Sequence, residues 1–241
     1  MTTLKVNAIE PEGGTTNLTI GMTGQNVVIG GSGGLKANVF KDAGGNALFT
    51  SNGSGTVTGV GLGCVVLISS QTVTNQASIS FTSGITSTYK EYKFEWINMN
   101  PVTDNQALQF NGSTDGGSNY NVTKTTTFFD TNHSEGGGGA NLSYTAGSDL
   151  AQSTAFQTLA SNVGNAASES TVGELHLFNP ASTTYVKHFY SKCNFASADS
   201  DRYTQNQHVA GYFNTTTAIN AIQFKFASGN FDGTIKMYGI K

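Results

Sequence analysis

The sequence has few charged residues and very little proline. Asp, Glu, Lys and Arg together make up 11% of the 241 residues, and there are only 3 prolines. A helical protein would need Ala, Leu, Glu and Lys in bulk. Glycine supplies 30 residues, with Ser, Thr and Asn abundant beside it. This composition argues against a helical protein and is typical of many short strands joined by tight turns.

The chain also lacks a basic excess and a long apolar run. Its formal net charge is -3, and no Lys/Arg-rich stretch is present to neutralise phosphates. We therefore expect no nucleic-acid partner. No run approaches the span of a bilayer, and residues 1–10 have no apolar core of signal-peptide length. We expect a chain that is made in the cytoplasm and does not insert into a membrane.

Two cysteines are present, Cys64 and Cys193, and each lies in an apolar, strand-like run. Nothing in their spacing suggests a bridge, and a cytoplasmic origin keeps thiols reduced. Free cysteines are among the most buried residue types. The sequence therefore predicts two buried free thiols.

Residues 1–62 form a distinct region of very short apolar segments separated by Gly-rich turns. Ordering the backbone costs roughly 1–2 kcal/mol per residue, so strands this short do not hold together alone. They need a partner surface, and the simplest one is another copy of the chain. We expect an arm that anchors the protein or forms oligomers through its apolar residues, which are Leu4, Val6, Ile9, Leu18, Ile20, Val27 and Ile29.

From residue 63 onward the strands lengthen and alternate. Tyr92, Phe94 and Trp96 fall on one face of a strand, and Lys93 and Glu95 fall on the other. The spacing predicts an antiparallel, jelly-roll-like β-sandwich over residues 63–241. Its ten expected strands are Cys64–Ser69, Ala77–Phe81, Tyr92–Trp96, Ala107–Phe110, Val122–Phe129, Glu174–Phe178, Tyr185–Phe195, Val209–Phe213, Ile222–Phe226 and Thr234–Ile240.

One stretch, Ser153–Ser168, lacks the alternation of a strand. Phe156, Leu159 and Val163 stand at near-helical spacing, but the Gly, Asn and Ser content around them disfavours a helix. We expect a loop packed by its own apolar residues.

No pattern of catalytic or metal-binding residues is evident. The four histidines fall in no metal-ligand spacing, and no Gly-x-Ser-x-Gly turn joins a strand to a helix. Asp199 and Asp201 form a lone Asp-x-Asp in a polar segment, with too few oxygen ligands for a calcium loop. We expect no catalytic residue, no metal and no cofactor, and hence no enzyme.

Recognition would use the polar segments between strands, because binding residues concentrate on loops. Three long loops are expected, at Gly112–Tyr120, Asn132–Asp149 and Ala196–Gln207. Aromatic faces there could stack on sugar rings while polar groups bind hydroxyls. Alternatively, the tyrosines cover the sandwich edge or a subunit contact. The candidate receptor-facing residues are Tyr120, Tyr144, Asp199, Asp201, Arg202 and Tyr203.

Two parts of the sequence resemble virion proteins of marine tailed bacteriophages. The opening Thr3–Pro11, followed by Gly13–Gly21, is similar to the start of many tail-fibre-like proteins of these phages. A second resemblance, to a β-sandwich domain of the same phages, is carried by Tyr89–Phe94, Leu175–Pro180, Ala210–Asn214 and Ile235–Lys241.

The resemblance implies a virion structural protein whose N-terminal arm attaches to the particle and whose sandwich is displayed outward as a homotrimer. Its expected partners are other copies of itself and other virion proteins of the tail or capsid. A tail fibre or short appendage that contacts a host-surface glycan or protein is the first hypothesis. A capsid decoration or head-fibre protein with a purely structural role is the alternative. A particle-borne glycan hydrolase comes third, because no acid pair or triad is evident.

Overall fold

The computed structural model describes residues 39–41, 44, 46–51, 57–59 and 64–241. Contacts within the chain divide it into two compact units, Met1–Leu62 and Gly63–Lys241. In the first unit, β1 (Val39–Lys41), β2 (Ala47–Ser51) and β3 (Val57–Gly59) form a three-stranded antiparallel sheet. The seven apolar residues expected to anchor the arm, from Leu4 to Ile29, lie outside the described residues.

The second unit consists of strands and connecting loops, and its described residues include no helix. No helix in the described part of the chain is therefore long and apolar enough to cross a membrane. Twelve strands follow one another: β4 (Val65–Gln76), β5 (Ile79–Phe81), β6 (Glu91–Pro101), β7 (Gln106–Ser113), β8 (Lys124–Ser134), β9 (Ala140–Tyr144), β10 (Gln157–Val163), β11 (Thr171–Phe178), β12 (Lys187–Ala196), β13 (Tyr203–Phe213), β14 (Ala221–Phe226) and β15 (Phe231–Ile240).

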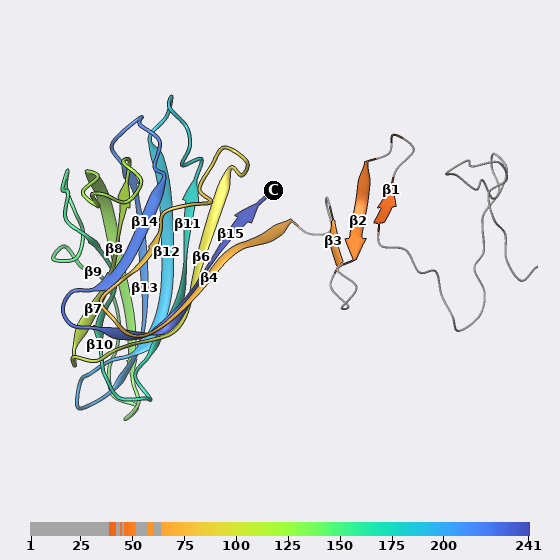
Figure 1. Ribbon diagram of the computed structural model, residues 1–241. Coiled ribbons are helices and arrows are strands. Elements are labelled where there is room, and N and C mark those ends of the chain that lie inside the picture. The colour runs from red at the N-terminus through yellow and green to blue at the C-terminus, as the bar shows by residue number, and fades with distance from the viewer. Residues whose placement is uncertain (1–38, 42–43, 45, 52–56, 60–63) are drawn as a thin grey trace, which may run out of the picture. The chain divides into compact units, whose positions relative to one another are not determined.

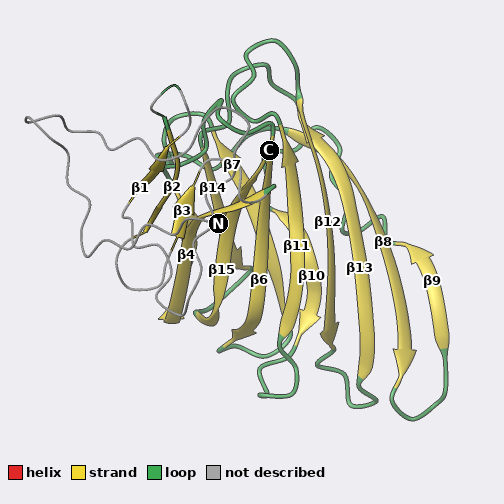
Figure 2. Cartoon of the chain, turned by 90° about the vertical axis from the view of Figure 1, so that its right-hand side faces the viewer, coloured by secondary structure: helices red, strands yellow, loops and turns green. Residues whose placement is uncertain are grey.

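These strands form two antiparallel sheets, which confirms the predicted β-sandwich. One sheet has four strands in the order β10-β7-β14-β5, and the other has eight in the order β4-β15-β6-β11-β12-β13-β8-β9. Figure 2 shows the strands of the larger sheet side by side in this order.

The connections follow a jelly-roll path. The chain crosses between the sheets at each step from β4 to β8, so that β4, β15, β6 and β11 are neighbours in one sheet and β5, β14, β7 and β10 in the other. Two Greek keys interleaved in this way define a jelly roll. Strands β8 and β9 follow β7, and β12 and β13 follow β11, and these four widen one sheet to eight strands (Figure 1).

Aromatic side chains fill the space between the sheets. Tyr92, Phe94 and Trp96 of β6 are at most 1% exposed, as the alternation predicted. The ring of Phe224 on β14 lies 5.5 Å from that of Phe94 and 6.4 Å from that of Trp96. Buried aromatic pairs add specific ring contacts to the large apolar area they remove from water. This layer joins the two sheets.

The expectation of a loop at Ser153–Ser168 is wrong. Residues Gln157–Val163 form β10, an edge strand of the four-stranded sheet, and Leu159 and Val163 are fully buried. The register against β7 shifts twice along β10, and Asn162 adopts a positive φ of 53°. These irregularities break the two-residue period, so the apolar residues no longer alternate as in a regular strand.

Two of the three expected loops are also partly wrong. Asn132–Asp149 contains the end of β8 and all of β9, and Ala196–Gln207 contains the start of β13. On β13 the inward-facing Gln205 and Gln207 are polar although they are buried. The strand is therefore polar on both faces there, and the apolar alternation that marks a half-buried strand is missing.

The two thiols differ in environment. Cys193 is buried in β12, where its Sγ lies 3.1 Å from the carbonyl oxygen of Leu159. Burial raises the pKa of this thiol to about 12. Cys64 lies one residue before β4 and is exposed, so the prediction of two buried thiols is wrong for Cys64.

We expect one reactive thiol in the folded protein. A soluble maleimide should modify Cys64 rapidly, whereas Cys193 should react only after unfolding, because the thiolate is the reactive form and burial suppresses it. Mass spectrometry before and after denaturation would count one added group and then two. Two added groups on the native protein would contradict the burial of Cys193.

Lys124 on β8 is fully buried, and no carboxylate among the described residues pairs with it. Its Nζ donates to the carbonyl oxygens of Val122 at 3.1 Å and Ala155 at 2.5 Å. It also lies over the ring of Phe213, 5.8 Å from its centre. Burial disfavours the charged form and lowers the pKa of Lys124 to about 7.

Protein stability should therefore rise with pH through Lys124. Between about pH 7 and pH 10.5 the unfolded chain keeps this proton and the folded chain has lost it, so the unfolding free energy gains at most about 1.4 kcal/mol per pH unit. Urea unfolding of the wild type and Lys124→Met at pH 7, 8.5 and 10 would measure this.

The slope should be flatter in Lys124→Met than in the wild type. Lys192→Met, which removes a lysine whose side chain is 60% exposed, serves as the matched control and should keep the wild-type slope. Equal slopes in Lys124→Met and the wild type would show that Lys124 is not the responsible group.

Candidate functional site on the outer face of the large sheet

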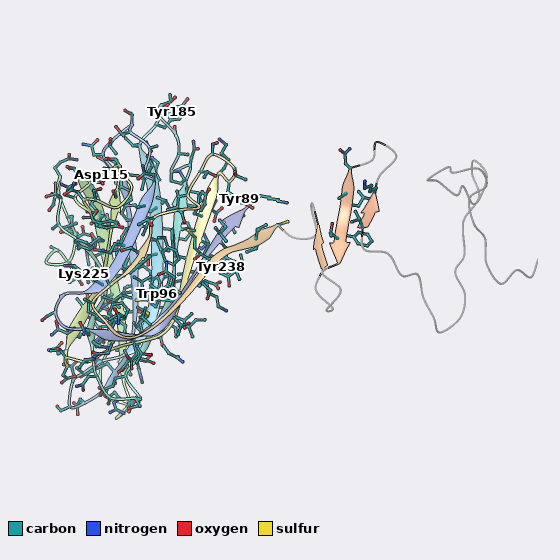
Figure 3. The ribbon with its side chains drawn as sticks, viewed as in Figure 1. Tyr89, Trp96, Asp115, Tyr185, Lys225 and Tyr238 are labelled. Atoms are coloured by element: carbon teal, nitrogen blue, oxygen red, sulfur yellow. The ribbon has the colours of Figure 1, made fainter. Side chains whose placement is uncertain are left out.

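The candidate site is the outer face, by which we mean the side of the eight-stranded sheet turned away from the four-stranded sheet. Alternate residues of each strand point there, and antiparallel register aligns them into rows across the sheet. One row joins Tyr238, Lys93, His176, Tyr190 and Ala210, and the next joins Lys236, Glu95, Glu174, Lys192 and His208. Tyr238 and the inward-facing Trp96 are labelled in Figure 3.

Charged side chains pair between neighbouring rows. Glu91 lies 2.6 Å from Nδ1 of His176, and Glu174 lies 3.6 Å from Nε2 of the same ring. Lys93 donates to Glu95 at 2.5 Å. This hydrogen bond raises the pKa of Lys93 and lowers the pKa of Glu95. Both groups of this pair are therefore held in their charged forms.

A hollow of about 400 Å³, here named the charged hollow, opens over β6, β11, β12 and β13. Glu95 and Glu174 stand directly opposite each other in the register between β6 and β11. Gly173 lines the hollow, and a Cβ at this position would meet the inward-facing Trp96 ring. The outward-facing side chains that line it are Glu95, Ile97, Val172, Glu174, Lys192, Asn194 and Asn206.

The two opposed carboxylates, Glu95 and Glu174, are groups that can bind a polar ligand. Glu95 is kept ionised by Lys93, which lowers its pKa. The pair can accept hydrogen bonds from hydroxyl groups, and Lys192 and the two asparagines can donate them.

A second, aromatic feature lies beside the charged hollow. The His176 and Tyr190 rings are nearly parallel, with their centres 4.7 Å apart, and Phe178 lies 5.7 Å from Tyr190. Tyr190 is 45% exposed. Burial, with the charges of Glu91 and Glu174, raises the pKa of its hydroxyl, which therefore stays neutral.

On the other side of Tyr190, the neighbouring residue in the row is Ala210 of β13. Its small side chain leaves a hollow of about 160 Å³, which adjoins another of about 350 Å³ at Thr127 and Ala210. We name this depression the aromatic cup. Its floor is Ala210, its hydroxyl wall is Thr125 and Thr127, and its aromatic rim is Phe129, His188, Tyr190, His208 and Tyr212.

The cup contains no carboxylate and no lysine. Among the residues that the structure describes, no cluster of three or more His, Cys, Asp or Glu side chains could hold a metal ion. The cup therefore offers ring faces, hydroxyls and imidazole nitrogens, which are groups that bind neutral polar molecules.

The residues predicted from the sequence to face a receptor lie in three separate places. Tyr120 is half-buried, and its buried hydroxyl has no hydrogen-bond partner in the part of the chain that the structure describes. Tyr144 ends β9, where its ring packs edge-on against Phe129 at 5.4 Å and its hydroxyl donates to Asp149.

The other four lie at the turn between β12 and β13. Asp199 and Asp201 are exposed there, whereas Arg202 bonds the buried Glu169 at 3.1 Å and Tyr203 begins β13. The loop of Tyr120 lies at the opposite end of the sandwich. There the backbone NH of Gly116 donates to Asn220, which lies in the connection between the far end of β13 and the start of β14.

The structure thus does not bring the six residues together, and their role in recognition stays a prediction. Tyr144 reaches the edge of the outer face through Phe129. Sequence reasoning did not identify the aromatic rim on β12 and β13. A signal was present in His188-Phe189-Tyr190, where aromatic residues occupy both faces of one strand.

Comparison with known proteins adds no relative: no protein-family model, no curated protein and no solved structure matches this chain.

Gly173, which lines the charged hollow, is packed tightly against its neighbours. A Cβ at this position would lie 2.4 Å from the Trp96 ring and 2.6 Å from the carbonyl oxygen of Lys192. Gly173→Ala should therefore lower the unfolding free energy by about 1–3 kcal/mol, as overpacking does.

Urea unfolding would measure this effect. Gly138→Ala is the matched control, because a Cβ there meets nothing within 4 Å, and it should change stability little. Equal stability of Gly173→Ala and the wild type would refute the tight packing of Trp96 under the sheet.

Proposed function

We propose that this chain is a surface protein of a tailed-phage particle, attached through residues 1–62 and displaying the jelly-roll unit for recognition of the host surface. The observation that carries this proposal is the outer face, on which the charged hollow and the aromatic cup lie side by side. Exposed aromatic side chains next to hydrogen-bonding groups are typical of recognition surfaces.

The chemistry of the outer face supports recognition over turnover. Glu95 is ionised beside Lys93, and Glu91 is engaged with His176. A displayed protein also needs a rigid frame, and strands hold side chains more precisely than loops do. The sequence resemblance described above supports the attachment to a particle.

The proposal predicts where the protein is found. Antibodies against residues 63–241, carried on gold, should label intact particles of the phage that encodes the chain when viewed by electron microscopy. Label at the tail would support an appendage that contacts the host. Label over the head would favour the alternative of a capsid decoration protein, and particles without label would overturn the proposal.

The native mass of the purified protein tests the expected assembly. Light scattering should give three times the chain mass of 25.2 kDa if the full chain trimerises. Deletion of residues 1–62 should then lower the mass to that of a single unit. A trimer that survives this deletion would place the contacts on the jelly roll instead.

A further inference from the structure

We infer that the aromatic cup binds one sugar ring of a neutral polysaccharide, whose neighbouring rings extend over the charged hollow. This inference rests on the proposed function, since it names the ligand that the displayed unit would recognise. The proposed binding site lies on a sheet face, whereas the sequence predicted recognition by loops.

Tyr190 is built as a stacking platform. His176 covers one face of the Tyr190 ring, with 14° between the ring planes, and Glu91 fixes His176 through the 2.6 Å hydrogen bond. The other side of Tyr190 lines the hollow above Ala210. A ring already held in place loses little conformational freedom when a ligand stacks on it.

The size and polarity of the cup fit a sugar ring. Its part beside Tyr190 has a volume of about 160 Å³, well below the roughly 300–1,000 Å³ of sites that enclose a drug-sized ligand. A single ring can enter while the rest of the molecule remains outside. Thr127, His208 and the Tyr190 hydroxyl supply hydrogen-bond donors and acceptors.

The charged hollow extends the site beyond one ring. Gly173 on β11 and Ala210 on β13 are two strands apart, which is about 10 Å across a sheet. A polymer lying on this face would therefore reach both features. On the outer face of β6, β11, β12 and β15, Lys93, Lys192 and Lys236 stand against Glu91, Glu95, Glu174 and Asp232, so no positive excess selects an anionic polymer.

Affinity electrophoresis of the full chain tests the inference. Gels would contain dextran, laminarin or galactomannan as neutral polysaccharides, and heparin as an anionic comparison. Retardation by at least one neutral polysaccharide is expected. Tyr190→Ala removes the platform and Ala210→Leu fills the floor, and each should weaken the binding at least tenfold.

Tyr185→Ala is the matched control. Tyr185 is 69% exposed in the loop before β12, at one end of the sandwich (Figure 3). It lines neither hollow of the cup, and its loss should leave binding unchanged. Urea unfolding of each variant would show that it is folded. Two different substitutions keep the test valid if one of them disturbs the sheet.

Three results of the electrophoresis would overturn the inference. They are no retardation in any neutral polysaccharide, retardation by heparin alone, and binding that Tyr190→Ala and Ala210→Leu leave intact. A change in native mass caused by Tyr190→Ala would also overturn it, by showing that the cup is a contact between copies. If the particles are labelled by gold but the protein binds no polysaccharide, this inference alone is refuted. If the protein binds polysaccharide but is absent from the particles, only the proposed function is refuted.

Discussion

Packing of aromatic rings between the two sheets is the constraint on which the rest of the structure depends. Phe224 of β14 contacts Phe94 and Trp96 of β6, and Phe110 of β7 packs on Phe189 of β12 at 5.0 Å. Because side chains alternate along a strand, these inward rings fix which residues point outward. A slip of one residue in β6 would bury Lys93 and Glu95 and expose Trp96. The core therefore determines which residues form the outer face, although the outer face is not part of the core.

The widened part of the large sheet is held differently. At the start of β13 the inward side chains are polar, and Gln207 exchanges hydrogen bonds with Ser161 of β10, at 2.6 Å to the hydroxyl and 2.8 Å from the backbone NH. Such buried amides are stable only when they are paired. The aromatic residues of this region lie on the outer face, where they surround the small Ala210. The alternation of side chains along β13 places the small Ala210 on the outer face, and the cup forms above it. No loop is needed to form the cup.

The sequence allowed the fold to be predicted where one face of each strand is apolar. The alternation in β6 and in Lys187–Ala196 was clear enough to place both strands and the sandwich around them. It failed for β10, whose register shifts hide the period, and for the start of β13, which is polar on both faces. The candidate site was missed for a related reason. His176, Tyr190 and Ala210 are distant in sequence and meet only through the register of three strands, which a single sequence does not display.

A site on a flat sheet face makes only shallow contacts, so one copy would bind a sugar polymer weakly. The hollows are open and small, and affinity depends on buried contacts after the loss of motional freedom is subtracted. Repetition of the site compensates for this weakness, because linked sites raise the effective concentration of each for a repetitive ligand. The expected homotrimer would display three such faces, and a particle would display many trimers. Weak single sites would then allow release and rebinding along a polymer, while the assembled particle stays attached.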